Sequence, residues 1–134
     1  MTNNSQEFSE IQVLIVDDMA TNRKVLQHLI RRIGAVPESC ESGKKALQLC
    51  ASKDFHLILL DLHMPEMSGF EVGEKIIAQR STSLPLVVAQ TADETPHACD
   101  RTQSIGFDGH LTKPIRPNKI IDFLRSIQEI IEQD

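Results

Sequence analysis

Short apolar runs alternate along this chain with segments whose apolar residues recur every three or four positions. The runs occupy residues 11–16, 35–40, 55–60, 84–89 and 109–112. β-Branched and aliphatic residues dominate most of them, which is typical of buried strands, and the spacing between them is that of amphipathic helices. Strands that are apolar on both faces favour a parallel sheet covered by helices on each side, with right-handed crossovers. The alternation therefore predicts an α/β fold: a doubly wound, five-stranded parallel sheet with five helices.

Residues that are typical of helix ends occur at the expected positions in this pattern. The first helix is expected from about residue 21 to 33, with Gly34 as its C-terminal stop. Ser42 is expected to cap the second helix, and Thr95, followed by a proline, the fourth. The apolar positions are Val25, Leu26, Leu29, Ile30 and Ile33 in the first helix, and Ile120, Ile121, Leu124, Ile127 and Ile131 in the last. Pro37 favours an edge position for the second strand because proline cannot donate a ladder hydrogen bond.

Length, charge and cysteine content narrow the function classes. With 134 residues the chain suits one domain, expected over residues 11–132 after a polar N-terminal tail at residues 1–10. A net charge of −5 argues against a nucleic-acid surface. The longest apolar run is far shorter than the ~20 residues that a membrane helix needs. Three cysteines without metal-ligand spacing are typical of reduced thiols. We therefore expect a cytoplasmic protein without direct nucleic-acid or membrane contacts.

Polar side chains stand at the carboxyl ends of four of the five expected strands. They are Asp17 and Asp18 after the first, Asp61 after the third, Thr91 after the fourth and Lys113 after the fifth. Ligands bind outside these ends in open parallel sheets, near the point where the strand order reverses. Three carboxylates gathered there repel one another, which suggests raised pKa values or a divalent cation. Ligation by oxygen alone fits Mg²⁺ better than zinc, which prefers His or Cys.

The same side chains have the chemistry of phosphoryl transfer. A carboxylate can attack phosphorus to form an aspartyl-phosphate, and Asp61 is placed to be that nucleophile. Lys113 is a point charge suited to a phosphoryl oxygen, and Thr91 can donate a hydrogen bond to another. Mg²⁺ and the lysine would stabilise the charge on the transferred group. Each residue alone has an ordinary structural explanation, so it is their shared position that predicts a site.

Four motifs in this order resemble the receiver domain of two-component response regulators. They are "VLIVDD", "LLDLHMPEMSGFEV", "TA" and "LTKP", beginning at residues 13, 59, 91 and 111. The match covers roughly residues 11–130, nearly the whole chain. The resemblance implies the flavodoxin-like receiver fold, with strand order 2-1-3-4-5.

The resemblance also implies how the acidic residues share the work. Asp61 matches the phosphoacceptor. Asp17 and Asp18 match the acidic pair that organises Mg²⁺, with Asp18 expected to ligate the ion directly. The backbone carbonyl of His63 matches the third protein ligand.

Further matches concern the phosphoryl group. Thr91 matches the switch hydroxyl that moves towards it, and Ala92 is expected to donate its backbone N–H to it. Lys113 matches the lysine that pairs with the phosphoryl oxygens, and Lys113–Pro114 resembles the family's cis peptide.

Three positions bear on how the switch works and how long it lasts. Receivers often carry Tyr or Phe three residues before the lysine, where this chain has His110. A His can also change rotamer and respond to pH near neutrality, although it is equally well a half-buried strand residue. His63 lies two residues after Asp61, and Asp93 lies two residues after Thr91. Both resemble positions that tune the hydrolysis of aspartyl-phosphate.

As a whole, the resemblance implies a phosphorylation-dependent signalling switch. It is not an enzyme, beyond catalysing its own phosphorylation and dephosphorylation. A sensor histidine kinase or a histidine phosphotransfer protein would donate the phosphoryl group. A downstream protein would read the switch at the fourth helix, fifth strand and fifth helix. The chain is expected to be a stand-alone receiver, a phosphorelay shuttle, or a module of a hybrid histidine kinase.

Two other function classes share parts of the pattern. A Mg²⁺-dependent phosphohydrolase would also form an aspartyl-phosphate, but such enzymes commonly use a DxD pair. Asp17 and Asp18 are adjacent and are expected to point in opposite directions. A flavodoxin-like cofactor binder would need a glycine- or hydroxyl-rich phosphate loop, whereas "DDMATNRK" is acidic at its start. We therefore rank both behind the receiver interpretation.

Overall fold

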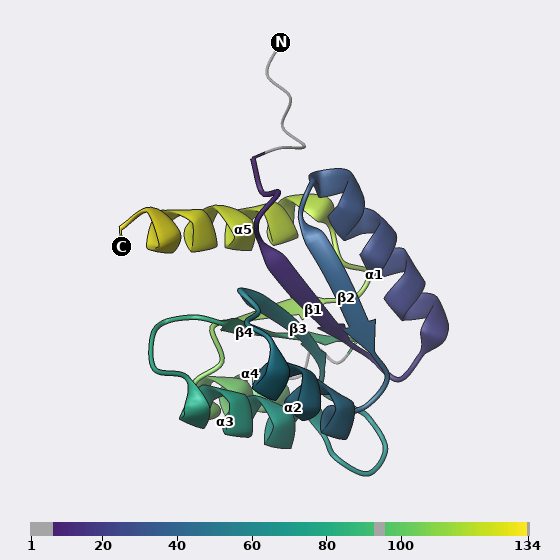
Figure 1. The fold of residues 1–134 in the computed structure, drawn as a ribbon. Coiled ribbons are helices and arrows are strands. Elements are labelled where there is room, and N and C mark those ends of the chain that lie inside the picture. The colour runs from purple at the N-terminus through teal and green to yellow at the C-terminus, as the bar shows by residue number, and fades with distance from the viewer. Residues whose placement is uncertain (1–6, 93–95, 134) are drawn as a thin grey trace.

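The computed structural model describes residues 7–92 and 96–133 and contains a five-stranded parallel sheet in the order β2-β1-β3-β4-β5 (Figure 1). The strands are β1 (Gln12–Val16), β2 (Val36–Cys40), β3 (Leu57–Asp61), β4 (Leu86–Thr91) and β5 (Gly109–Thr112). The expected fold class and strand order are confirmed. β2 lies at one edge, as Pro37 indicated, and β3 is central and buried along its whole length.

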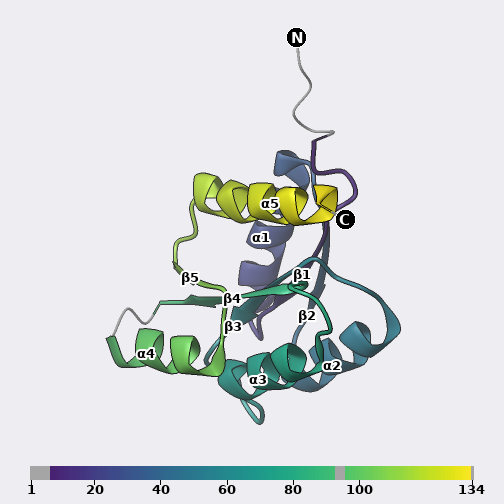
Figure 2. The same ribbon diagram turned by 90° about the vertical axis from the view of Figure 1, so that its left-hand side faces the viewer.

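Five helices cover the two faces of this sheet. They are α1 (Ala20–Ile33), α2 (Gly43–Ser52), α3 (Gly69–Gln79), α4 (Pro96–Ile105) and α5 (Pro117–Glu132). α1 and α5 lie on one face, and α2, α3 and α4 lie on the other (Figures 1 and 2). Strand side chains alternate between the faces, so Val13 and Ile15 join the core under α1 and α5. Leu14 and Val16 join the core under α2 and α3.

The helix ends follow the chemistry of the expected capping residues. Gly34 ends α1 in the left-handed conformation with a φ of 109°, which a residue without a Cβ adopts freely. The hydroxyl of Ser42 accepts a hydrogen bond from the backbone N–H of Lys45 at the start of α2. Both predictions are confirmed. Thr95, the expected cap of α4, lies outside the described residues.

β3 and β4 lie further along the chain than their apolar runs suggested. The expected starts at residues 55 and 84 shift to 57 and 86. Phe55 is buried although it precedes β3, and the pairing of β4 continues beyond the apolar run, where Thr91 pairs with Thr112. The limits of β3 and β4 are therefore set by pairing between strands and not by the extent of the apolar runs. As a result, Asp61 is the last residue of its strand and does not follow it.

Two positions assigned to apolar helix faces are wrong. Val25 is 61% exposed and Ile131 is 39% exposed. The buried face of α1 is centred on Leu26 and Ile30. At 100° per residue, Val25 lies about 120°, or about a third of a turn, away from that centre. Ile131 lies in the last turn of α5. Helical spacing alone does not show which edge of a broad apolar stripe meets the sheet.

The segment expected to be a polar tail contributes to the core. Phe8 is only 3% exposed and belongs to the same buried cluster as Ile11. The side-chain amide of Gln128 in α5 donates a hydrogen bond of 2.6 Å to the backbone carbonyl of Glu7. Packing of the chain thus begins upstream of residue 11. Across residues 7–92 and 96–133, no helix combines the length and apolar character required to cross a membrane.

Gly69 lies against the backbone of the residue that carries the expected chemistry. A Cβ placed on Gly69 would overlap the carbonyl oxygen of Asp61 and the Cα of Leu62. The Gly69 N–H also donates to the carbonyl of Leu62 at 3.0 Å. Only glycine lets the start of α3 approach the end of β3 this closely.

We expect Gly69→Ala to lower the free energy of unfolding by about 1–3 kcal/mol, because backbone atoms cannot yield to the added methyl group. Urea denaturation measures this change. Gly106→Ala is the matched comparison: Gly106 has a positive φ of 107°, but a Cβ there would meet only Cγ2 of Ile77, at an ordinary contact distance of 3.7 Å. It should cost about 1 kcal/mol, from backbone conformation alone. A cost at Gly69 no larger than that at Gly106 would contradict the close approach.

Candidate functional site

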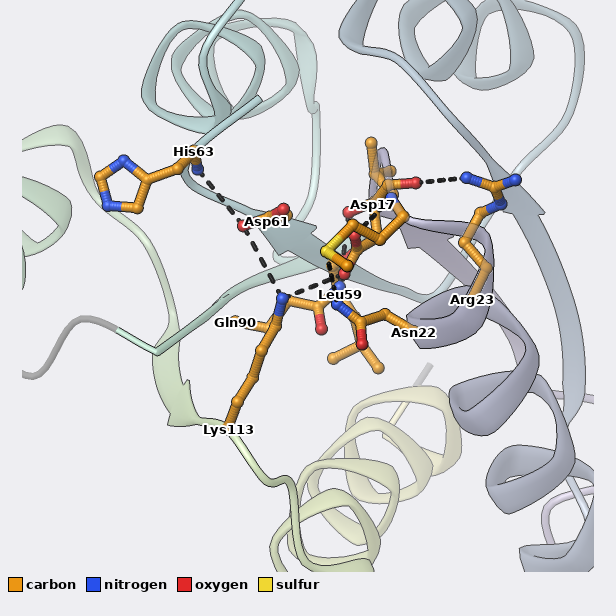
Figure 3. Close-up of polar contacts among 10 residues, drawn as sticks. Asp17, Asn22, Arg23, Leu59, Asp61, His63, Gln90 and Lys113 are labelled. Carbon is orange, nitrogen blue, oxygen red and sulfur yellow. Dashed lines mark hydrogen bonds and ion pairs between the residues drawn. The ribbon is translucent and has the colours of Figure 1, made fainter. Parts of the chain in front are cut away.

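Three carboxylates meet at the carboxyl ends of the two central strands. Oxygen atoms of Asp17, Asp18 and Asp61 all lie within 4.8 Å of one another (Figure 3 shows Asp17 and Asp61). β1 and β3 are neighbours, and their parallel register brings these ends to the same edge. The expectation that Asp17 and Asp18 point in opposite directions is wrong. β1 ends at Val16, so the strand alternation behind that expectation no longer applies to the pair.

Asp17 is fully buried and both of its carboxylate oxygens are engaged. The backbone N–H of Met19 donates to Oδ1 at 2.9 Å, and Nζ of Lys113 contacts Oδ2 at 3.1 Å. The guanidinium of Arg23 donates to the backbone carbonyl of Asp17 at 2.8 Å (Figure 3). A buried carboxylate is stable only with such partners. Asp18 differs, because it is exposed to solvent.

Asp61 is 6% exposed and only partly compensated. Nζ of Lys113 lies 4.0 Å from its Oδ1, and the backbone N–H of His63 donates to the same oxygen at 3.3 Å (Figure 3). Burial, opposed by Lys113 and assisted by the Asp17 carboxylate, raises the pKa of Asp61 to about 6. Asp61 is therefore a buried acid, and in the absence of a bound cation its negative charge destabilises the folded protein.

The ends of β4 and β5 supply the remaining groups. Thr91 is buried at the end of β4, and Ala92, which follows it, is exposed. The N–H of Lys113 donates to the Thr91 carbonyl at 2.9 Å, which fixes the lysine beside β4. The Lys113–Pro114 peptide is cis, as the resemblance implied, and a second cis peptide precedes Pro85. Asp93 lies outside the described residues.

The two histidines singled out in the sequence face α3 and α4. His110 is half-buried in β5, and its Nδ1 lies 3.6 Å from the thiol of Cys99 in α4. Its Nε2 atom is buried without a hydrogen-bond partner in the described structure. The ring of His63 points away from Asp61 (Figure 3) and packs edge-to-face on Phe70. The structure thus places His110 against α4, and places only the backbone of His63 against the acidic cluster.

Sequence reasoning missed three residues that support the cluster. Arg23 and Gly69 hold the ends of β1 and β3 in place, as described above. Gln90 is fully buried, and its side-chain amide lies 3.4 Å from the Val16 carbonyl and 3.5 Å from the Leu59 carbonyl. A polar residue directly between the apolar run at residues 84–89 and Thr91 was the signal that could have identified Gln90.

The donor set of the acidic cluster fits Mg²⁺. It consists of carboxylate oxygens, the ligand type that Mg²⁺ prefers. Ligands about 2.1 Å from a shared ion lie at most about 4.2 Å apart, so an inward shift of a few tenths of an ångström would bring all three carboxylates to one ion. A divalent cation would also relieve the repulsion between the carboxylates, which adds to the effect of burial on the pKa of Asp61.

A family model for the response regulator receiver domain matches residues 13–125. This chain belongs to that family. Receivers are the phosphorylation-dependent signalling switches of two-component systems, and the chain is such a domain. The interpretation drawn from the four sequence motifs is confirmed.

Curated relatives place the same domain in short and long proteins. The two-component response regulator ORR3 of rice (Oryza sativa subsp. indica) is 31% identical over 112 residues, which cover 83% of this chain and 86% of that protein. The sensor histidine kinase AruS of Pseudomonas aeruginosa is 38% identical over 117 residues, which cover 84% of this chain and 11% of that protein. This chain therefore spans a small part of several relatives that it matches.

Solved structures agree with this assignment. The chemotaxis protein CheY4 of Vibrio cholerae has a TM-score of 0.80 at 26% identity, covering 88% of this chain and 98% of that one. The receiver domain of Ssk1 from Saccharomyces cerevisiae, crystallised with the histidine phosphotransfer protein Ypd1, has a TM-score of 0.74 at 26% identity. That match covers 84% of this chain and 85% of that one.

The raised pKa of Asp61 predicts a pH-dependent effect of Asp61→Asn. Because the folded-state pKa lies near 6, above the ordinary 3.8, the stability linked to protonated Asp61 is complete below pH 3.8 and is lost as pH rises through 6. Removing the charge should therefore stabilise the metal-free protein by about 2 kcal/mol at pH 7.5, and by much less at pH 4.5. Urea denaturation in EDTA measures both values. Asp122→Asn, an exposed change in α5, should show no such pH dependence, and an equal gain at both pH values for Asp61→Asn would contradict the raised pKa.

Proposed function

We propose that Asp61 accepts a phosphoryl group from a phosphohistidine, with Mg²⁺ as cofactor, and that the resulting aspartyl-phosphate is the signal. The observation that carries this proposal is the convergence of three carboxylates and one lysine within a few ångströms. A carboxylate oxygen of Asp61 attacks phosphorus as the P–N bond of the donor breaks, and the imidazole nitrogen keeps the bonding electron pair. The phosphoryl group thus moves without any other reactant.

The chain's own groups act on the charge of the transferred group. Lys113 lies 4.0 Å from Asp61, and its contact with Asp17 holds it at the edge of the site. Thr91 is the last residue of β4 and Ala92 follows it. The hydroxyl of Thr91 and the N–H of Ala92 are proposed to donate hydrogen bonds to phosphoryl oxygens. Mg²⁺, held by Asp17, Asp18, Asp61 and the carbonyl of His63, would neutralise developing negative charge.

Asp17 argues against the alternative of a phosphohydrolase that acts on small substrates. Such an enzyme needs a second carboxylic acid that can exchange a proton with the leaving group. Asp17 is fully buried and held by the Met19 N–H and by Lys113, so it is not placed beside the leaving group of a small substrate, whereas the remaining lone pairs of its oxygens can still hold Mg²⁺. We therefore propose that catalysis is limited to the domain's own phosphorylation and dephosphorylation.

The cytoplasmic location of the protein stays a prediction.

We propose that a histidine phosphotransfer protein or a histidine kinase docks beside α1. Met19 is 57% exposed and Val25 is 61% exposed there, beside a hollow of about 160 Å³ that Gln90 and Lys113 also line. A partner histidine that reaches Asp61 must cover the surface around the strand ends. The resemblance to the Ssk1 receiver, which was crystallised with such a partner, supports this proposal.

The output is proposed to pass through α4, β5 and α5. His110 connects β5 to Cys99 of α4, so movement at the end of β4 or β5 would reach that helix. Two-state switches of this kind need about 5.5 kcal/mol of differential stabilisation to move from 1:99 to 99:1. New charge-assisted hydrogen bonds from Thr91 and Lys113 to a phosphoryl group are the proposed source.

Acetyl phosphate tests the acceptor directly. With Mg²⁺, intact-mass spectrometry should show one phosphoryl adduct on the wild-type protein. The adduct should be absent from Asp61→Asn, which lacks the nucleophile, and from samples containing EDTA. Asp122→Asn should be labelled like wild type. An adduct that persists in Asp61→Asn would disprove Asp61 as the acceptor, and labelling that is insensitive to EDTA would disprove the role of Mg²⁺.

A charge on the α1 surface should separate docking from chemistry. A panel of phosphorylated histidine phosphotransfer proteins that includes Ypd1 is first screened for members that label the wild type. With those donors, we expect Val25→Asp to slow phosphotransfer at least about ten-fold. Placing a charge at the centre of an apolar contact has a cost of this order. Labelling by acetyl phosphate should not change. Val36→Asp, at an exposed valine of β2, is the matched control, and an equal loss there would count against docking at α1.

A further inference from the structure

A stack of three side chains connects His63, in the loop that follows Asp61, to helix α4. The ring of His63 meets Phe70 of α3 edge-to-face, with ring centroids 6.5 Å apart and planes at 77°. The guanidinium carbon of Arg101 in α4 lies 3.9 Å from the Phe70 ring centroid. α3 and α4 lie side by side on the same face of the sheet (Figure 2). The stack therefore runs from the phosphorylation site to α4 without passing through Thr91 or His110.

The centre of the stack is buried and its two ends are exposed. Phe70 is 6% exposed and packs in a buried cluster with Leu62 and Ala98. His63 and Arg101 are exposed residues, and Arg101 lines a groove of about 420 Å³ between α3 and α4. The buried Phe70 ring thus contacts both the guanidinium of Arg101 and the imidazole of His63, and each contact restrains an exposed neighbour.

We propose that Arg101 is a positioning residue for dephosphorylation, acting through Phe70 on the ring of His63. This inference rests on the proposed function, because it concerns the lifetime of the aspartyl-phosphate. The backbone N–H of His63 already contacts Asp61, while its ring is held away from the site towards Phe70 (Figure 3). With the ring held there, the face of the phosphoryl group beside His63 stays open to an attacking water.

Loss of the cation should release the ring. A cation–π contact of about 0.5–1 kcal/mol corresponds to a factor of about two to five in rate. We therefore expect Arg101→Ala to let the imidazole cover the phosphoryl group, and to lengthen the half-life of phospho-Asp61 by about two- to five-fold. A partner that draws Arg101 away from Phe70 would act as the Arg101→Ala change does and would prolong the signal that it reads.

A double-mutant cycle tests the route. The four proteins are wild type, Arg101→Ala, His63→Ala and the double variant, each labelled with acetyl phosphate, desalted and followed by intact mass. The effect of Arg101→Ala should disappear in the His63→Ala background, since the ring on which it acts is gone. Arg125→Ala, an exposed arginine change in α5, should not alter the half-life. If Arg101→Ala fails to fold, Arg101→Gln keeps the aliphatic stem and carries the same test.

Nuclear magnetic resonance of the unphosphorylated proteins gives an independent readout. The ring-proton shifts of His63 report the nearby Phe70 ring and should change in Arg101→Ala but not in Arg125→Ala. Absence of any adduct on the wild type would disprove the proposed function, whereas the NMR result would still decide whether Arg101 positions His63. An unchanged or shortened half-life, an equal effect in both backgrounds, or unchanged His63 shifts would each overturn the inference.

Discussion

The contact between Lys113 and Asp17 is the interaction on which the site depends. Lys113 follows β5 at one edge of the sheet, and Asp17 follows β1 on the far side of β3 and β4. The side chain of Lys113 thus reaches from the end of β5 to the acidic cluster at the ends of β1 and β3. Without a cation there, a fully buried carboxylate would stand beside two others, an arrangement that proteins avoid. The ion pair makes the acidic cluster compatible with a stable fold.

The same contact leaves Asp61 incompletely compensated. Lys113 lies 3.1 Å from Asp17 but 4.0 Å from Asp61, and the pKa of Asp61 remains raised by burial and by Asp17. The cation already has a partner, so it can be shared with a group added to Asp61 but does not neutralise Asp61 beforehand. A site in this condition gains more from a divalent cation and from new hydrogen-bond donors than a fully paired site would. The uncompensated charge on Asp61 is therefore what would make the proposed site respond to a cation and to a phosphoryl group.

The sequence allowed the fold class to be predicted because each strand is an apolar run and each helix has its own periodicity. Strand order and residue roles came instead from the four motifs. The gathering of Asp17, Asp61 and Lys113 was predictable because parallel strands bring their carboxyl ends to one edge. The direction of Asp18 was not, because alternation stops where a strand ends. The stacking of Arg101 on Phe70 and the contact of His110 with Cys99 depend on how α3 and α4 pack, which no local pattern contains.

Phe8 ties the folded unit to a part of the chain outside the family pattern. The matched segment begins at residue 13, yet Phe8 is buried under α1 and α5, and Gln128 of α5 holds the backbone of Glu7. Burial of a phenylalanine contributes about 1.5–3 kcal/mol, a substantial part of the 5–15 kcal/mol that is typical for a domain. A polypeptide joined upstream would therefore be anchored on α5 before it reaches β1. Mechanical tension on such a connection would pull first on α5, one of the elements proposed to present the signal.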